Sequence, residues 1–240
     1  YIGSLMKGTM SVIDEPSAAD LEVYSKHVFI NTPYNKDKEL IAEGEAGNPI
    51  PKKVGDPSPI KYVFYIIKEN RTYDQVFGDI KEGNGDSTLT LFGEKYTPNQ
   101  HKLAREYVLL DNFYVDAEVS ADGHNWSLGA YATDFLEKTW PTSYGRRGGQ
   151  NDGLGRRTVA NNKDGFIWDI AKKHGVSFRT YGVFADKDKG NIPVLDEAHV
   201  ASTFTGYYDQ NVKDVVRFEQ WKADFDILLS KNAVPQLNTI

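Results

Sequence analysis

The chain has 240 residues, of which 40% are hydrophobic and 12% aromatic, enough for a full core in one or two domains. Its formal net charge is −6 and it contains no basic block, which argues against nucleic acid as the main partner. The absence of Cys excludes disulfide scaffolds and Cys-based metal sites, and no apolar run reaches the length of a membrane span.

Residues 1–16 alternate weakly between apolar and polar side chains, and Lys7-Gly8-Thr9 predicts a turn between two short strands. The segment ends in GTMSVID and resembles the terminal repeat of bacterial β-propellers. An irregular N-terminal hairpin is the alternative interpretation. Because the chain begins at Tyr1 as though in the middle of a strand, we expect it to be part of a longer protein.

A helix and a polar connection are expected next. Ser17 predicts the N-cap of a short helix from Ala18 to His27. Residues 35–59 are polar and rich in Gly and Pro, which is typical of a linker or covering loop. The composition becomes globular from Ile60 onward, so the chain is expected to divide into regions 1–16, 17–59 and 60–240.

The apolar run YVFYII at 62–67 is rich in aromatic and β-branched side chains and predicts a strand buried on both faces of a parallel sheet. Glu69 and Asn70 follow where this strand should end. Ligands of open α/β sheets bind beyond the carboxyl ends of the strands, and two oxygen donors there suit a metal ion. An ordinary polar turn is the alternative for this dipeptide.

The longer string ENRTYDQVFGD, which starts at Glu69, resembles the opening motif of a phosphoesterase family. That family holds bacterial phospholipases C and related acid phosphatases and belongs to the alkaline phosphatase superfamily. The resemblance implies that Glu69 and Asn70 bind a catalytic divalent metal ion. It also implies a periplasmic, cell-envelope or secreted location.

A second strand and a helix are predicted around residue 120. Residues 107–114 read as another buried strand or its end, and HNWSLGAYATDFLEK at 124–138 reads as a helix. Ser120 lies between them, where a helix N-terminus favours phosphate and where a base or metal could activate the hydroxyl. A loop serine or a helix cap is the alternative. The spacing from Glu69 fits one strand–helix–strand excursion between neighbouring strand ends.

The segment LAREYVLLDNFYVDAEVSADGHNW resembles the part of the same family that carries the nucleophile. Ser120 matches the nucleophile, and His124 and Asn125 match a polar cluster that contacts substrate phosphate. Many relatives read Thr-x-Pro-Asn where this chain reads Ser-Ala-Asp-Gly-His-Asn, so which side chain touches phosphate stays open. A capping or surface histidine is the alternative for His124.

The loop 139–157 contains two Arg pairs among several glycines. Arg146 and Arg147, and likewise Arg156 and Arg157, are candidates for phosphate contact. A solvated loop is the alternative for each of them. No Walker-type or GxGxxG fingerprint with its strand–helix context is present.

The C-terminal part continues the α/β pattern. We expect a helix at 165–174 capped by Asp164, a third buried strand at 176–184, and a long helix at 211–231 with a broad apolar face. AVPQLNT, just before the last residue, reads as the start of another strand. The predicted fold is α/β, a mostly parallel sheet flanked by helices, partly alkaline-phosphatase-like, after a short N-terminal β segment.

The resemblance implies a metal-dependent phosphoester hydrolase that acts through a phosphoserine and takes a small phosphoester or a phospholipid headgroup. The metal could be Ca, Mg, Mn or Zn. The family completes its metal site with later Asp and His ligands, and the contexts of His174, His199, Asp186 and Asp188 do not support them in that role. We therefore expect these ligands beyond residue 240. The alternative is a non-catalytic surface protein with a phosphoesterase-like binding domain.

Overall fold

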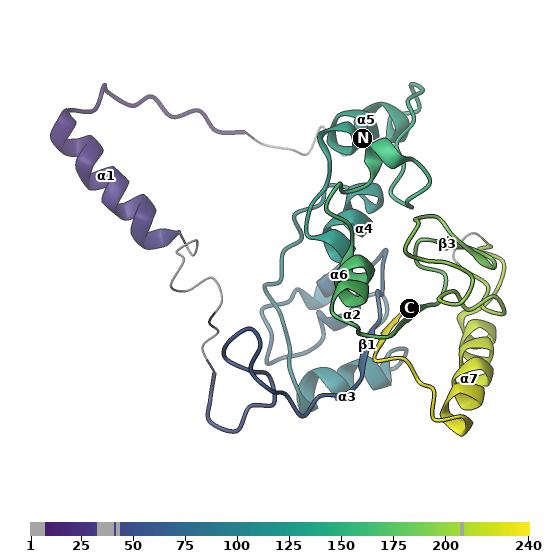
Figure 1. Cartoon of the computed structure of the whole chain (residues 1–240). Helices are drawn as coiled ribbons and strands as arrows, with labels where there is room; N and C mark the ends of the chain where they lie inside the picture. The colour runs from purple at the N-terminus through teal and green to yellow at the C-terminus, as the bar shows by residue number, and fades with distance from the viewer. Residues whose placement is uncertain (1–7, 33–40, 42–43, 207–208) are drawn as a thin grey trace. The chain divides into compact units, whose positions relative to one another are not determined.

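The computed structural model describes residues 8–32, 41, 44–206 and 209–240. The chain divides into two compact units, Tyr1–Lys61 and Tyr62–Ile240. Figure 1 shows the elements in chain order. Within the described residues, no helix is long and apolar enough to cross a membrane.

The first unit contains the helix α1 (Ala18–Asn31). Ser17 caps it as predicted: the Asp20 amide donates to Ser17 Oγ, and the Asp20 carboxylate accepts from the Ser17 amide. No α1 side chain is buried. Residues 8–17 form no strand, and the remainder of the expected hairpin, residues 1–7, lies outside the described residues. The described part of the expected linker has one isolated bridge, between Ile41 and Lys53.

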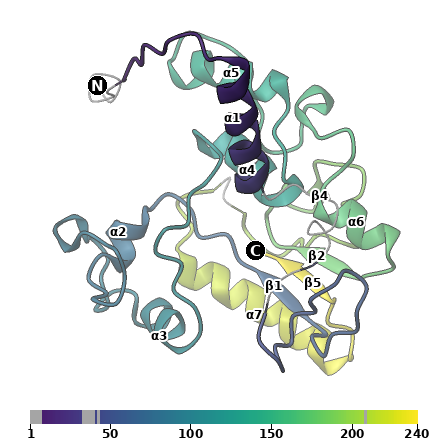
Figure 2. The same cartoon turned by 90° about the vertical axis from the view of Figure 1, so that its left-hand side faces the viewer.

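The second unit is built on a parallel sheet of three short strands, seen side by side in Figure 2. Its order is β1 (Val63–Tyr65), β5 (Leu237–Thr239), β2 (Phe178–Thr180). Leu237 pairs with Val63 on one side and with Phe178 on the other. A last strand in sequence therefore forms the centre of the sheet.

Two of the predicted strands are confirmed, together with their parallel arrangement in one sheet. The run 62–67 contains β1 and the run 176–184 contains β2. The AVPQLNT segment supplies β5, as its pattern indicates. The expected burial of 62–67 on both faces is wrong, because β1 is an edge strand and Phe64 stays 40% exposed.

The predicted strand at 107–114 is wrong. Tyr107, Phe113 and Tyr114 are exposed, and the segment forms an irregular loop. Two polar residues interrupt the apolar run, and they bind a distant turn: the Asn84 amide donates to Asp111 Oδ2 at 2.8 Å, and Asn84 Nδ2 donates to Asn112 Oδ1. Side-chain bonds of this kind hold the backbone in a loop, while β5 takes the place beside β1.

Helices surround the sheet in the second unit. The segment between β1 and the Ser120 region folds into short helices: α2 (Tyr73–Phe77), the 3₁₀ turn η2 (Ser87–Leu89) and α3 (Pro98–Glu106). His101 of α3 is fully buried, and its Nε2 lies 2.8 Å from Asp79 Oδ1. This contact ties α3 to the chain that follows α2.

The predicted helix at 124–138 is two helices, α4 (Ser120–Gly129) and α5 (Asp134–Tyr144). Ala130 ends α4 with φ of 50°, a left-handed C-cap. Thr133 Oγ1 then accepts from the Leu136 amide and starts α5. Two cap signals divide an apolar stripe that reads as continuous in the sequence. The 3₁₀ turn η3 (Thr158–Ala160) follows.

The helix predicted at 165–174 is α6 (Ile167–Lys173). Its N-cap is Phe166 instead of Asp164, because the Asp169 carboxylate reaches back to the Phe166 amide at 2.8 Å. Gly175 ends it with φ of 68°, as expected for a glycine C-terminus. The short hairpin of β3 (Ala185–Asp186) and β4 (Lys189–Gly190) lies in the charged loop after β2.

The last helix, α7 (Asp214–Ser230), lies against the sheet (Figure 2). Arg179 of β2 donates two hydrogen bonds to Asp224, and Tyr181 donates a third at 2.8 Å. Phe64 of β1 meets Phe225 edge to face at 6.0 Å. Part of the apolar face of α7 thus packs against the sheet, while Val215 and Leu229 remain exposed.

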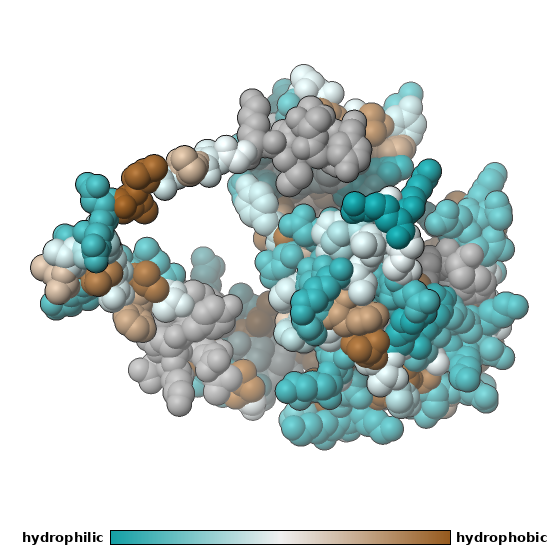
Figure 3. All heavy atoms as spheres, turned by 90° about the horizontal axis from the view of Figure 1, so that it is seen from above, coloured by the Kyte–Doolittle hydropathy of each residue, from teal (hydrophilic) through white to brown (hydrophobic). Residues whose placement is uncertain are grey.

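The main core lies between the sheet and α6. Trp168 is fully buried, and its Nε1 donates to Thr239 Oγ1 of the central strand. Phe166, Phe178 and Phe184 pack in the same cluster. Many other large apolar side chains are exposed, and Figure 3 shows brown apolar residues among teal polar ones on one face.

Candidate functional site

Glu69 and Ser120 meet at one edge of the sheet. The ladder between β1 and β5 continues past the strand, since the Ile67 amide donates to the Ile240 carbonyl at 2.9 Å. Glu69 follows this last ladder bond, and Ser120 is the first residue of α4. Ser120 Oγ donates a short hydrogen bond to Glu69 Oε1, across 51 residues of chain.

The backbone before α4 is held by Asp122, which is fully buried. Its two carboxylate oxygens accept from the amides of Glu118 and Val119, each at 3.0 Å. These two bonds to one carboxylate fix the start of the helix at Ser120, the residue that meets Glu69. Sequence reasoning missed this role, because Asp122-Gly123 resembles a turn and Val119 is not a capping residue. The sequence signal for this role was an acidic residue, Asp122, at the third position of a helix, which is typical of a side chain that caps the helix start.

Asn70 turns the chain away from the sheet. Its φ is 66°, a left-handed conformation that Asn tolerates better than most residues. The Arg71 guanidinium donates to the Asn70 carbonyl at 2.5 Å and lies 5.0 Å from the centre of the Phe92 ring. The turn keeps Asn70 beside Glu69 on the wall of one cavity.

His124 lies one helical turn after Ser120 on α4, so the two side chains share a face of the helix. It lines the same cavity as Glu69 and Asn70. Burial lowers the pKa of His124 below its usual range, and the nearby Glu69 carboxylate opposes this only in part. The imidazole is therefore neutral at pH 7 and can donate from one nitrogen and accept at the other.

The other predicted contacts lie elsewhere. Asn125 is buried, and its Nδ2 donates to the Ala160 carbonyl at 2.9 Å, which ties α4 to η3. Arg146 and Arg147 are exposed in the loop after α5. None of these three side chains lines the cavity beside Glu69. The structure thus brings together Glu69, Asn70, Ser120 and His124.

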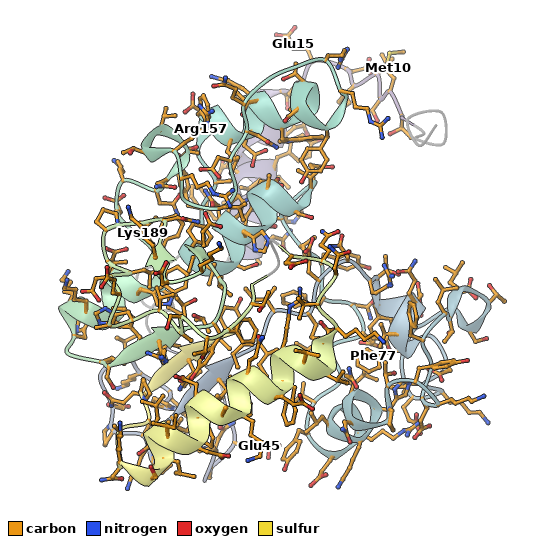
Figure 4. All side chains as sticks on the ribbon, turned by 90° about the vertical axis from the view of Figure 1, so that its right-hand side faces the viewer. Met10, Glu15, Glu45, Phe77, Arg157 and Lys189 are labelled. Atoms are coloured by element: carbon orange, nitrogen blue, oxygen red, sulfur yellow. The ribbon has the colours of Figure 1, made fainter. Side chains whose placement is uncertain are left out.

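The second Arg pair also lies away from Glu69. Arg156 donates two hydrogen bonds to Asp186, at 2.8 and 2.7 Å. The Arg157 amide donates to Asp152 Oδ2 at 2.6 Å, and its side chain is labelled in Figure 4. Arg156 lines a second cavity, of about 1160 Å³, together with Lys163 and Lys189.

The cavity beside Glu69 has a volume of about 900 Å³. Its polar part carries Lys68, Glu69, Asn70 and His124. The same cavity is lined by apolar side chains, mostly from β1 and α7: Phe64, Ile66, Phe218, Trp221 and Phe225. Gln210, Asp214 and Arg217 also line it. The volume is typical of a site for a drug-sized molecule.

The donors at this site suit a hard divalent cation. Glu69 offers a carboxylate, Asn70 an amide oxygen and Ser120 a hydroxyl, which are the ligands that Ca²⁺, Mg²⁺ and Mn²⁺ prefer. In the part of the chain that the structure describes, no group of three or more His, Cys, Asp or Glu side chains could hold a metal ion. The residues present fit part of a metal site.

What the arrangement can do chemically follows from its position. The site joins the Ser120 hydroxyl at a helix N-terminus with the Glu69 carboxylate, which accepts a hydrogen bond from it. The neutral imidazole of His124 and a cavity adjoin this pair. Comparison of the chain with family models, with curated proteins and with solved structures gave no match in any of the three.

Proposed function

We propose that this chain carries the nucleophile and part of the metal site of a phosphoester hydrolase of the phospholipase C and acid phosphatase type. The observation that carries the proposal is the hydrogen bond from Ser120 Oγ to Glu69 Oε1. It joins the two residues to which two motifs of the same resemblance assign roles, one as nucleophile and one as metal ligand.

The position of Ser120 supports phosphate as the group that it attacks. As the first residue of α4, it lies among backbone N–H groups that are not used within the helix and at the positive end of the helix dipole. Both features favour a phosphoryl group over a neutral one. His124, neutral and one turn away, offers a further hydrogen bond to a phosphoryl oxygen.

A divalent ion would be held by the Glu69 carboxylate, the Asn70 amide and the Ser120 hydroxyl. When bound, it supplies positive charge that screens the substrate phosphate and favours the alkoxide of Ser120. Ca, Mg and Mn suit the oxygen donors, and Zn would suit a set that gains His ligands.

The proposed covalent steps use Ser120 and Glu69. Ser120 Oγ forms a bond to phosphorus while the bond from phosphorus to the leaving oxygen breaks. The proton of Ser120 passes through Glu69 Oε1 to the leaving oxygen, so Glu69 is again a carboxylate. Water then attacks the phosphorus of the phosphoserine: its oxygen stays on the released phosphate or phosphomonoester, and one of its protons returns through Glu69 Oε1 to Ser120 Oγ.

The substrate is a small phosphoester or a phospholipid headgroup, and a cell-envelope or secreted location is part of the same proposal. The test is chromogenic phosphoester hydrolysis with Mn, Ca and Zn added in turn. It is run on the 240-residue chain and on a longer protein that also carries the further metal ligands this proposal requires. We expect metal-dependent turnover by the longer protein and little by the chain alone, because two oxygen donors and a hydroxyl hold a divalent ion weakly.

Glu69→Gln tests the metal role directly. The substitution removes the single negative charge among the proposed ligands, so calorimetry should show weaker binding of each metal. If the longer protein carries further Asp and His ligands and is inactive with every metal, the alternative of a non-catalytic binding domain is favoured instead.

A further inference from the structure

The cavity beside Glu69 has an aromatic wall. Trp221 and Phe225 of α7 stack at 5.1 Å with 16° between their planes. Phe64 of β1 meets both rings edge to face, at 6.4 and 6.0 Å. Phe218, one turn before Trp221, lies 5.8 Å from it. All four rings line the cavity, and Phe218 is 57% exposed.

This wall is fixed before any ligand arrives. Asp224 lies between Trp221 and Phe225 on α7 and accepts three hydrogen bonds, from Arg179 and Tyr181. Both partners belong to or directly follow β2, so the helix is clamped to the sheet in one register. Figure 4 shows α7 lying across the strands. A preorganised wall loses little conformational entropy when a ring packs against it.

One cavity thus holds Glu69, Asn70 and His124, the four rings, and the α7 side chains of Asp214 and Arg217. A phosphoryl group beside Glu69 and Ser120 leaves its organic group facing the rest of the same space. Aromatic rings prefer edge-to-face or offset contact with other rings, which an aliphatic group of equal size cannot make. The exposed part of Phe218 and the edge position of Phe64 leave such ring surfaces available.

We propose that this site selects phosphoesters whose organic group is an aromatic ring. The inference rests on the proposed function for the position of the phosphate, and its evidence is the ring cluster of Phe64, Phe218, Trp221 and Phe225. The selection acts on binding, so it is measurable without turnover.

The experiment compares three phosphonates with the same head group: methylphosphonate, cyclohexylphosphonate and phenylphosphonate. Calorimetry in a large excess of Mn²⁺, which fills even a weak metal site, measures each dissociation constant on the 240-residue chain. We expect phenylphosphonate to bind at least about tenfold more tightly than methylphosphonate, from burial of the ring. It should also bind severalfold more tightly than cyclohexylphosphonate, from ring–ring contact.

Phe218→Ala should reduce the phenyl-to-methyl ratio severalfold, and Phe64→Leu should reduce the phenyl-to-cyclohexyl ratio. The matched control is Val215→Ala, an exposed apolar residue of the same helix that does not line the cavity. It should leave all three constants unchanged. Circular dichroism of each variant verifies that α7 is intact.

The outcomes separate the two proposals. Equal binding of the three phosphonates, or no binding of any, overturns the aromatic selection. A phenyl preference that the Phe218 variant does not change also overturns it. A retained phenyl preference in the chain, with no turnover by the longer protein under any metal, supports the aromatic site and refutes the hydrolase.

Discussion

Ser120 is a side chain whose removal should cost activity and little else. It is half-buried at the start of α4, which Asp122 caps through the backbone, so the helix start does not depend on the Ser120 hydroxyl. Its bond to Glu69 lies at the cavity, where the proposed chemistry occurs.

We therefore expect Ser120→Ala in the longer protein to abolish hydrolysis and to shift the melting temperature by less than about 2 °C, as for a surface substitution. The matched control is Ser127→Ala on the same helix, whose Oγ donates only to the Gly123 carbonyl. That variant should keep its turnover. Phosphate release and thermal melting are the measurements, and an active Ser120→Ala variant would refute the nucleophile assignment.

His124 should give stability a dependence on pH. Its pKa in the folded chain lies below the value of about 6.5 in the unfolded chain, mainly because of burial. Between these two values the unfolded chain binds more protons, so stability falls as pH decreases. The part of the stability that depends on a neutral His124 is fully present above about pH 6.5, and it is lost as pH falls toward the pKa of His124 in the folded chain.

Urea unfolding at pH 7.5, 6.5 and 5.5 measures this effect. We expect His124→Gln to lose less stability over this range than the original chain, because the neutral amide does not titrate. Glu69 is the charged group that acts on His124, so a Glu69→Gln variant should lose more stability than the original chain on acidification. If the free energy of unfolding changes equally with pH in all three chains, the assignment of a buried, neutral His124 imidazole is wrong.

At the scale of elements, α7 depends on one carboxylate. Asp224 and Arg179 are 15% and 16% exposed, and the carboxylate also accepts from Tyr181. Burial, and then the hydrogen bond to Asp224, raise the pKa of the Tyr181 hydroxyl well above its ordinary value. Removing the carboxylate leaves a buried guanidinium and a buried hydroxyl without their shared acceptor.

Asp224→Ala should lower the free energy of unfolding by about 3 kcal/mol, the cost of breaking a mostly buried pair. Asp226→Ala is the control on the same helix: its partner Lys222 is one turn away, and both side chains are more than half exposed. An exposed pair of this kind contributes about 0.5 kcal/mol or less. Chemical denaturation measures both free energies of unfolding. Similar losses in the two variants would show that the bonds of Asp224 to Arg179 and Tyr181 do not stabilise the fold more than an exposed ion pair does.

At the scale of the whole second unit, the sheet depends on its last strand. β5 pairs with β1 and β2, which come from distant parts of the sequence. Leu237, 7% exposed, belongs to the main core, and Thr239 accepts from Trp168. The three strands are short, so little other pairing supports the sheet.

Leu237→Ala should destabilise the second unit by about 2–4 kcal/mol, as for a large-to-small change in a core. Leu229→Ala is the control, since that side chain is 58% exposed on α7, and its change should stay within about 0.5 kcal/mol. Urea unfolding followed by tryptophan fluorescence reports the loss, because Trp168 contacts β5. A small effect at Leu237 would mean that the sheet does not hold this unit together.

Features that depend on neighbouring residues could be predicted from the sequence. Ser17 as the cap of α1, Gly175 as the end of α6, and the positions of β1, β2 and β5 all follow from local propensity and capping. The parallel pattern was also readable, because strands separated by helices return in the same direction. Ser120 was expected near Glu69 because of the resemblance and because of a strand at 107–114 that the structure does not have. It is the start of α4 at Ser120 that brings the serine to Glu69.

Which segments occupy the sheet, and where polar side chains point, depends on contacts that form in the folded chain. The run 107–114 has the composition of a strand, yet Asp111 and Asn112 bind Asn84 and β5 fills the place beside β1. Asn125 follows His124 directly, but the helical rotation turns it toward Ala160 and away from the cavity. Strand competition and side-chain direction depend on contacts between residues far apart in sequence, which local composition does not encode.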